Sequence, residues 1–377
     1  MRKAVYVEGN EKKIILANCI TKSEYEKIYK KNLVCPIDGC KAKLGFREVK
    51  KQRDGKYFYT LPNNKHVDGC PYKIQKKKRR VRRKIDNTQL EVWRENLIMS
   101  YKLICIDMDG TLLNNKHEIS ERNKEAIRKA TERGVKVAVT TGRLFASAKY
   151  YAGLLGVKTP IISCNGAFIR EKDEDKVIYE SVLNEDQLDR IYDVIKKYDI
   201  NMAYFNTPNT VISEKIVPEE HGYKVMNRMM GESKEKVMFS EGIDFREAFK
   251  TYGKHILKAI CIENDSNKLN DLFKAKEELK KYEDLEVVSS SPSNFEVMNK
   301  GTSKGCAVKV LADILNINRE EIMCLGDSEN DLSMIEFAGL GVAMGNAEEF
   351  LKEKADYITD TNENDGVAKA IEKFVLD

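Results

Sequence analysis

Apolar runs of strand length alternate with amphipathic stretches of helical length from about residue 101 onward. The apolar runs are 102–107, 135–141 and 160–165, and the stretches between them are 120–134 and 144–156. Runs bounded by turns predict buried strands, and an apolar position every three or four residues predicts helices. Strands that alternate with helices are typical of a parallel sheet with helices on both faces, so we predict an α/β fold with a Rossmann-like core.

This alternation stops near residue 183 and resumes after residue 294. The intervening residues, 183–294, combine two long amphipathic stretches with shorter strand-like runs, which predicts a second α/β lobe inserted into the first domain. Inserted lobes of this sort often cover a site. We therefore expect a core made of residues 100–182 and 295–377, with residues 183–294 as a cap domain.

The first quarter of the chain has a different composition. Residues 1–98 hold 26 Lys and Arg against 11 Asp and Glu, whereas the remaining residues hold 39 against 49. The segment 76–84, KKKRRVRRK, has eight cationic residues in nine. Such asymmetry indicates contact with nucleic acid or a membrane surface, although a solvated basic linker has the same composition. We expect a small basic module over residues 1–75 and a basic linker and helix over 76–99.

The overall composition, 42% hydrophobic and 33% charged, is typical of a folded chain rather than a disordered one. No apolar run approaches the roughly 18 residues of a membrane span, and the first residues lack the apolar core of a signal peptide. We therefore expect a cytoplasmic protein without a membrane partner. The sequence Met99-Ser100 resembles a start, so the chain could join two originally separate proteins, or the junction could be an artefact of gene prediction.

Two carboxylates follow the first apolar run of the core. Asp107 and Asp109 lie at its end, and a spacing of two places both side chains on the same side of a strand. Gly110 then permits a tight turn. Because ligands bind beyond the carboxyl ends of parallel strands, this pair predicts a site for a hard cation, the alternative being a solvated turn.

Three later segments offer further polar groups at strand ends or helix starts. Thr140, Thr141, Gly142 and Arg143 follow the second apolar run, where hydroxyl and backbone N–H groups receive anions, although they could equally form an ordinary turn. Lys304 opens a helix, where its charge opposes the helix dipole unless an anion compensates. The alternative is a surface lysine directed into water.

The last of these segments is GDSEND. Asp327 ends a predicted strand and Asp331 lies one helical turn later, so both could face one cation, or Asp331 could only cap the following helix.

The segments DMDGTLL, TTGR, GTSKG and GDSENDLSM together resemble the four signature segments of the haloacid dehalogenase superfamily, most closely its Cof-type subfamily. The resemblance covers about residues 101–377, and the inserted lobe is similar to the class IIB cap of that subfamily. The pair Asn165 and Gly166 resembles its short motif beside the substrate, the alternative being a hairpin turn.

The resemblance implies a Mg²⁺-dependent phosphatase that forms an aspartyl phosphate. Asp107 would be the nucleophile, Asp109 the acid and then the base, and Lys304 a charge-neutralising catalytic residue. The implied Mg²⁺ ligands are Asp107, Asp109 (through its carbonyl) and Asp327, with Asp331 steadying the ion. The implied phosphate- or substrate-binding residues are Gly110, Thr141, Gly142, Arg143, Asn165, Gly166 and Asn330. Thr140 could replace Thr141, because the register at that strand end is open.

The implied substrate is a small phosphorylated metabolite such as a sugar phosphate, a nucleotide or a cofactor phosphate. A phosphomutase or phosphotransferase shares the same segments and is the alternative within the superfamily. A nucleic-acid-associated protein targeted by residues 1–98 is the alternative from another class. His117, His221 and His255 are expected at the surface or in packing.

Two pairs of potential metal ligands lie in the first quarter. Cys35 and Cys40 form one pair, His66 and Cys70 the other, and each pair ends in Asp-Gly-Cys. The spacing resembles a structural Zn²⁺ site of zinc-ribbon type, the alternative being unligated thiols. Metal binding would supply folding energy that the core of so small a module lacks.

Overall fold

The computed structural model describes residues 101–230 and 235–377, together with five short backbone strands before residue 61. The chain divides into two compact units, Met1–Ser100 and Tyr101–Asp377. In the first unit, β2 pairs with β1 and β1 with β3, both antiparallel, while β4 pairs with β5. These strands are β1 (Lys3–Glu8), β2 (Glu11–Leu16), β3 (Leu33–Val34), β4 (Leu44–Glu48) and β5 (Lys56–Thr60). The segment 76–84 and the four proposed zinc ligands lie outside the described residues.

A five-stranded parallel sheet forms the centre of the second unit, as the alternating pattern predicts. Its strand order is β19-β18-β17-β6-β7. The strands are β6 (Leu103–Ile106), β7 (Lys136–Val139), β17 (Ile322–Gly326), β18 (Leu340–Ala343) and β19 (Tyr357–Ile358). A single parallel bridge from Thr140 to Ile162 joins β7 to a three-stranded antiparallel sheet. That sheet consists of β8 (Ile161–Ser163), β9 (Phe168–Arg170) and β10 (Val177–Glu180).

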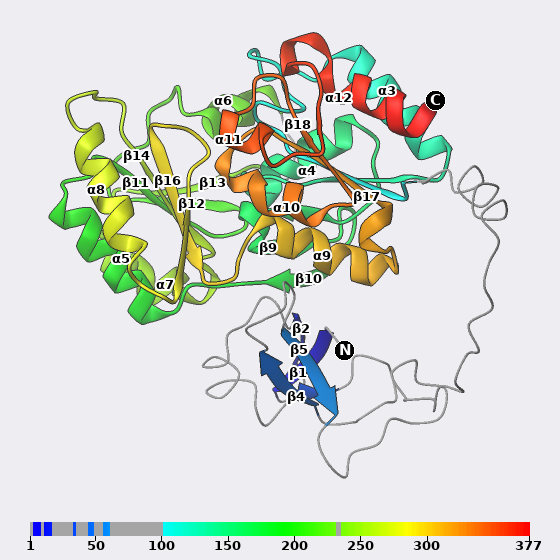
Figure 1. Ribbon diagram of the computed structural model, residues 1–377. Coiled ribbons are helices and arrows are strands. Elements are labelled where there is room, and N and C mark those ends of the chain that lie inside the picture. The colour runs from blue at the N-terminus through cyan, green and yellow to red at the C-terminus, as the bar shows by residue number, and fades with distance from the viewer. Residues whose placement is uncertain are drawn as a thin grey trace. The chain divides into compact units, whose positions relative to one another are not determined.

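Helices flank the parallel sheet, and in Figure 1 the helices α3 and α12 lie together while α9 packs beside α10. The core helices are α3 (Glu121–Glu132), α4 (Phe145–Leu154), α9 (Lys304–Leu315), α10 (Leu332–Phe337), α11 (Glu349–Lys352) and α12 (Gly366–Ile371). Single helical turns occur at Cys164–Gly166, Arg319–Glu321, Glu329–Asp331, Asn362–Asn364 and Glu372–Leu376. Within the described residues, no helix has the length and apolar character needed to cross a membrane.

The inserted lobe has its own six-stranded sheet, in the order β13-β12-β11-β14-β16-β15 (Figure 1). Its strands are β11 (Met202–Asn206), β12 (Thr210–Ser213), β13 (Met238–Glu241), β14 (Lys258–Ile262), β15 (Leu285–Val288) and β16 (Asn294–Asn299). Its helices are α5 (Glu185–Lys197), α6 (Gly222–Met229), α7 (Phe245–Tyr252) and α8 (Leu269–Leu279), and a short helical turn follows at Gly253–His255. The sequence pattern ends this lobe at residue 294, whereas in the structure strand β16 begins there and runs to Asn299.

The two faces of the lobe's sheet differ in composition because strand side chains alternate. On one face, Ala259 and Cys261 of β14 join Phe295 and Val297 of β16 in an apolar cluster with α5, α7 and α8. The intervening positions, including Lys258, Ile260 and Glu296, therefore point to the other face. That face lines the cavity described below.

Candidate active site

The candidate site lies where two central strands of the parallel sheet end. Strands β6 and β17 are neighbours, so Asp107 and Asp327, which follow their last residues, come close together although they are 220 positions apart in the sequence. The backbone N–H of Asp107 donates to the carbonyl of Leu325 at 3.0 Å and continues the pairing of the two strands. Only 4% of the surface of Asp107 is exposed.

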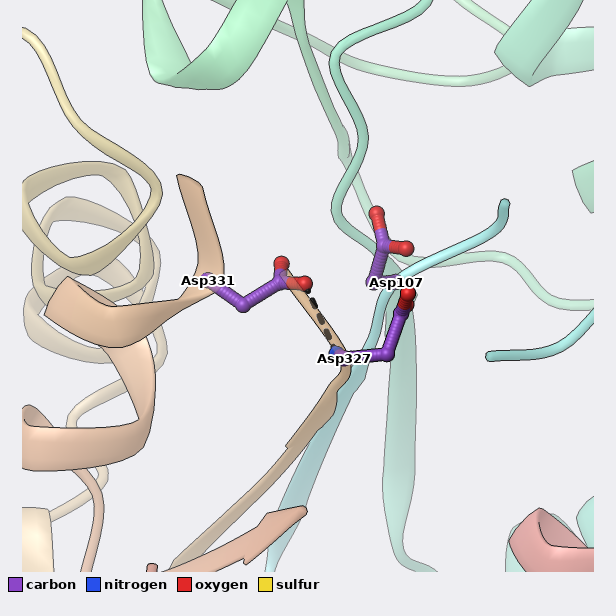
Figure 2. Close-up of side chains that lie close together, drawn as sticks. All are labelled: Asp107, Asp327 and Asp331. Carbon is purple, nitrogen blue, oxygen red and sulfur yellow. Dashed lines mark hydrogen bonds between the residues drawn. The ribbon is translucent and has the colours of Figure 1, made fainter. Parts of the chain in front are cut away.

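Three carboxylates converge at this point. Asp107, Asp327 and Asp331 each offer an oxygen, and the three atoms lie within 4.8 Å of one another (Figure 2). Burial, and then the charge of Asp331, raise the pKa of Asp107 well above its ordinary value, and the same two causes raise the pKa of Asp327 to about 7. This excess of negative charge fits a divalent cation, because oxygen ligands are what Mg²⁺ prefers.

Lys304 supplies positive charge within the carboxylate cluster. Its Nζ donates to Asp107 at 2.5 Å and to Asp331 at 2.6 Å, and the side chain is 1% exposed, so it does not extend into water. Burial alone would lower the pKa of Lys304, but the charges and hydrogen bonds of Asp107 and Asp331 together raise it. The side chain of Ser303 caps the helix that Lys304 begins, and this places the ammonium at the strand ends.

Asp331 holds two parts of the site in place. One of its oxygens binds Lys304, and the other accepts the backbone N–H groups of Asp327 and Ser328 at 3.0 and 3.1 Å (Figure 2). The Asp327 carboxylate in turn accepts hydrogen bonds from the hydroxyls of Thr111 at 2.7 Å and Ser328 at 2.9 Å. Asp331 therefore caps the loop after β17 and orients the lysine, in addition to lying within reach of a shared cation.

Asp109 has a different environment from Asp107. Arg143 donates to both of its oxygens, at 2.8 and 2.5 Å. Desolvation would raise the pKa of Asp109, but the hydrogen bonds and charge of Arg143 lower it. His117, expected to be a surface or packing residue, is exposed, and its Nδ1 lies 3.9 Å from an Asp109 oxygen. Arg143, expected to bind phosphate, is engaged by Asp109 in this structure.

The loop after β7 is held by its own hydrogen bonds. The Thr141 hydroxyl accepts the N–H of Arg143 at 3.1 Å, and the Thr141 carbonyl accepts the N–H of Asn165 at 3.0 Å. The Thr140 hydroxyl is buried without a hydrogen-bond partner among the described residues. The hydroxyl of Thr141, rather than that of Thr140, therefore takes part in the hydrogen bonds that hold this loop.

Asn165, Gly166 and Asn330 come together beside this loop. The Asn165 side-chain oxygen accepts a hydrogen bond from Asn330 at 3.1 Å, and Asn165 itself has a left-handed φ of 54°. Gly166 has a φ of +91°, and a Cβ there would lie 2.3 Å from the Ser303 carbonyl. Gly110 is equally constrained, with a φ of +79° and a Cβ position 2.3 Å from the Asp327 carboxylate. The Asn-Gly pair thus lies in the turn between the antiparallel strands β8 and β9 and closely contacts the start of α9.

A cavity of about 190 Å³ opens onto both Asp107 and Asp109. The core contributes Asp107, Asp109, Gly142, Arg143, Ser328 and Asn330, and the inserted lobe contributes Tyr223, Lys258, Ile260, Ser290 and Glu296. The sequence predictions missed the residues from the lobe. A signal was present for two of them, because Lys258 and Glu296 are charged residues inside otherwise apolar strands, which is unusual unless such residues are paired.

The chain matches the family of haloacid dehalogenase-like hydrolases over residues 104–371. A 5-amino-6-(5-phospho-D-ribitylamino)uracil phosphatase of Bacillus subtilis, YcsE, is 37% identical over 287 residues, which cover 76% of this chain and 100% of the relative. A phosphoglycolate phosphatase of Methanobrevibacter smithii is 31% identical, and the match covers 74% of this chain and 100% of the relative.

Solved structures agree with the sequence relatives. A haloacid dehalogenase-like hydrolase from Bacteroides thetaiotaomicron superposes with a TM-score of 0.61 at 32% identity, covering 73% of this chain and 99% of that one. The predicted parallel-sheet fold and the predicted enzyme class, a phosphoric monoester hydrolase, are confirmed. Over residues 104–371 this chain belongs to the haloacid dehalogenase-like hydrolases.

Proposed function

We propose that the protein is a Mg²⁺-dependent phosphatase of small phosphorylated metabolites that works through an aspartyl phosphate on Asp107. The observation that carries this proposal is the position of Asp107. Its carboxylate lies against Lys304, within 4.8 Å of Asp327 and Asp331, on the floor of a cavity that Asp109 also lines. The proposed nucleophile and a second carboxylate thus face one small cavity, and the ammonium of Lys304 lies against the nucleophile.

The residues present fit a divalent cation, because three converging carboxylates, two of them buried and one partly buried, meet a single buried ammonium among the described residues. Asp107 and Asp327 would hold the ion with their side chains and Asp109 with its backbone carbonyl, while Asp331 and Asn330 would support it. A Mg²⁺ ion held there would supply charge neutralisation to the phosphoryl oxygens. Its charge also favours the ionised form of Asp107, which a nucleophile requires.

In the first chemical step, a carboxylate oxygen of Asp107 attacks the phosphorus atom. The bond between phosphorus and the ester oxygen breaks, and Asp109 donates a proton to that leaving oxygen. In the second step, Asp109 as carboxylate takes a proton from water, whose oxygen attacks the phosphorus of the aspartyl phosphate. The acyl phosphate bond then breaks, which regenerates Asp107 and releases inorganic phosphate.

The pairing of Asp109 with Arg143 has a consequence for the acid role. The guanidinium favours the ionised form of Asp109, whereas an acid must carry a proton. A bound phosphate offers Arg143 other anionic oxygens, and guanidinium pairs well with phosphate. Release of Asp109 from Arg143 would let its pKa rise toward that of a desolvated carboxyl group.

Negative charge on the transferring group must be neutralised during both steps. Lys304, Thr141 and the backbone N–H groups near Gly110 are the proposed partners of the phosphoryl oxygens, and Gly142, Asn165 and Gly166 shape the loops beside them. The leaving group then faces the inserted lobe, a proposed cap. The named substrates of the relatives, a phosphoribitylamino-uracil and phosphoglycolate, support a small phosphorylated metabolite as the substrate here.

The experiment is turnover of a generic aryl phosphate and of a phosphometabolite panel by wild type and Asp107→Asn, with Mg²⁺, first without an acceptor and then with an added sugar. We expect the wild type to release free phosphate. Asp107→Asn should keep its fold and lose turnover, because an amide oxygen is a poor nucleophile. Activity that persists in Asp107→Asn contradicts the assignment, and transfer to an added sugar without phosphate release favours a phosphomutase or phosphotransferase.

For residues 1–98 we propose a zinc module held by Cys35, Cys40, His66 and Cys70, with a basic segment that can contact nucleic acid. The proposal rests on ligand spacing and on net charge. Zinc content of the full chain and of the Cys35→Ser/Cys40→Ser variant tests the metal. Equal zinc content in both contradicts it, and absence of salt-dependent binding to DNA or RNA at low salt contradicts the second part.

A further inference from the structure

Lys258 is a buried cation of the inserted lobe that contacts the catalytic loop of the core. It is 3% exposed, its Nζ donates to the carbonyl of Gly142 at 2.6 Å, and it forms an ion pair with Glu296. Lys258 begins β14, and Glu296 lies diagonally across from it on the neighbouring strand β16, so both side chains share the face that lines the cavity.

Fold stability alone does not explain a buried ion pair of this kind. Desolvation of its two charges costs several kcal/mol, and well-packed apolar residues in its place often give equal or greater stability. Apolar residues do occupy the opposite face of the same two strands, where they pack in the apolar cluster of the lobe. Burial would lower the pKa of Lys258, but the charge and hydrogen bond of Glu296, together with the effects of Tyr223 and Cys164, raise it overall and so keep the ammonium charged. The ammonium is thereby available to the core.

The hydrogen bond from Lys258 acts on the orientation of one peptide group in the core. The carbonyl of Gly142 and the N–H of Arg143 belong to the same planar peptide group. Lys258 binds this group at its oxygen, and the Thr141 hydroxyl accepts its N–H at 3.1 Å. Held at both ends, the peptide cannot rotate, and its orientation sets the direction in which the Thr141 hydroxyl and the Arg143 side chain leave the loop.

We propose that Lys258 is a positioning residue of the phosphatase: from the inserted lobe, it fixes the Gly142–Arg143 peptide and so orients Thr141 and Arg143, while Glu296 holds it in place. This rests on the proposed function of the site. Docking of the lobe is thereby coupled to the geometry of the loop that binds phosphate and engages Asp109. Lys258 acts through the loop, so its effect extends to every phosphate ester, irrespective of the leaving group.

The test compares three variants with wild type. Lys258→Met removes the donor, Lys258→Arg retains a cation, and Lys258→Met/Glu296→Leu removes the donor without leaving a buried carboxylate unpaired. Lys197→Met is the matched control, because Lys197 is a lobe lysine that pairs with Glu278 at the exposed surface, at 2.7 Å. The readouts are kcat and KM for two phosphate esters with different leaving groups, and hydrogen exchange of the Arg143 amide without substrate.

We expect Lys258→Met to lower kcat by about 10- to 100-fold for both esters, with a much smaller change in KM, because loop misplacement weakens transition-state contacts. The Arg143 amide should exchange faster, Lys258→Arg should recover part of kcat, and the double variant should stay as slow as Lys258→Met. Lys197→Met should match wild type.

Recovery of kcat in the double variant would overturn the proposal, since the defect would then come from an unpaired Glu296. Unchanged exchange of the Arg143 amide in both variants that lack the lysine would overturn it as well. The exchange measurement needs no turnover. If wild type hydrolyses no phosphate ester, the proposed function fails, and the exchange data still decide whether Lys258 holds the loop.

Discussion

Asp107 and Asp109 lie two residues apart, yet neighbouring charges act on them in opposite directions. Burial and then the neighbouring carboxylates raise the pKa of Asp107, whereas Arg143 lowers that of Asp109 against the effect of burial. The spacing of the two residues is visible in the sequence, and so is their place at a strand end. Their environments are not, because Arg143, Lys304 and Asp331 reach them from segments that are distant along the chain.

At the residue scale, the acid role of Asp109 predicts a dependence on the leaving group. Asp109→Asn should lower kcat by about 10²- to 10⁴-fold for an alkyl phosphate, whose leaving oxygen needs a proton, and less for an aryl phosphate in the first step. Single-turnover measurements of alcohol or phenol release with the two substrates test this. An equal loss for both substrates would contradict proton donation by Asp109.

A second prediction concerns pH and the cation. Because the pKa of Asp327 is raised to about 7, a proton competes with Mg²⁺ for this carboxylate below that pH. Affinity for Mg²⁺ should therefore fall as pH falls, by up to about tenfold per unit for each competing proton. Calorimetric titration of the protein with Mg²⁺ at about pH 8 and about pH 6 measures the effect. An affinity independent of pH across this interval would count against Asp327 as a ligand.

At the scale of elements, the strands and helices of the core follow from local pattern. The runs before Asp107 and Asp327 are continuously apolar, as strands buried on both faces must be, and they form β6 and β17. The sequence pattern did not distinguish the roles of Thr140 and Thr141 at the end of β7, because these two residues differ only in their tertiary contacts. The side chains of the lobe that line the cavity could not be predicted either. The alternation of side chains along a strand defines two faces, but it does not show which face is directed toward the core domain.

The turn after Asp109 gives a prediction at this scale. Gly110→Ala would force a left-handed φ onto a residue with a Cβ and push that atom against the Asp327 carboxylate. Gly134→Ala is the control, because its φ of +85° imposes similar strain while nothing lies within 4 Å of the added atom. Both should destabilise by about 1 kcal/mol or more from backbone strain, but only Gly110→Ala should also lose activity. Thermal unfolding and turnover measure these effects, and equal activity of the two variants would refute the spatial argument.

At the scale of the whole molecule, the catalytic elements all belong to the unit Tyr101–Asp377. The family match lies within this unit, over residues 104–371, and about three-quarters of the chain covers the entire length of each relative named above. The four signature segments made this division predictable, since each contributes a residue to one site despite the inserted lobe. The basic first quarter lies outside that account, because its charge and cysteines have no counterpart in the catalytic geometry.

The division predicts that a fragment starting at Tyr101 is an active enzyme. Its kcat/KM for a small phosphate ester should lie within about twofold of the full chain, because separate domains fold independently. Kinetics of the two proteins at equal concentration of folded protein measure this. A large loss in a folded fragment would mean that residues 1–100 take part in catalysis.

The most direct measurement of the central claim is to trap the intermediate. Enzyme mixed with an excess of a rapidly cleaved aryl phosphate and Mg²⁺ is quenched in acid and digested, and the peptides are mapped by mass spectrometry. We predict one phosphoryl group on Asp107 in the wild type and none in Asp107→Asn. A phosphoryl group on another residue, or turnover by Asp107→Asn, would contradict Asp107 as the nucleophile.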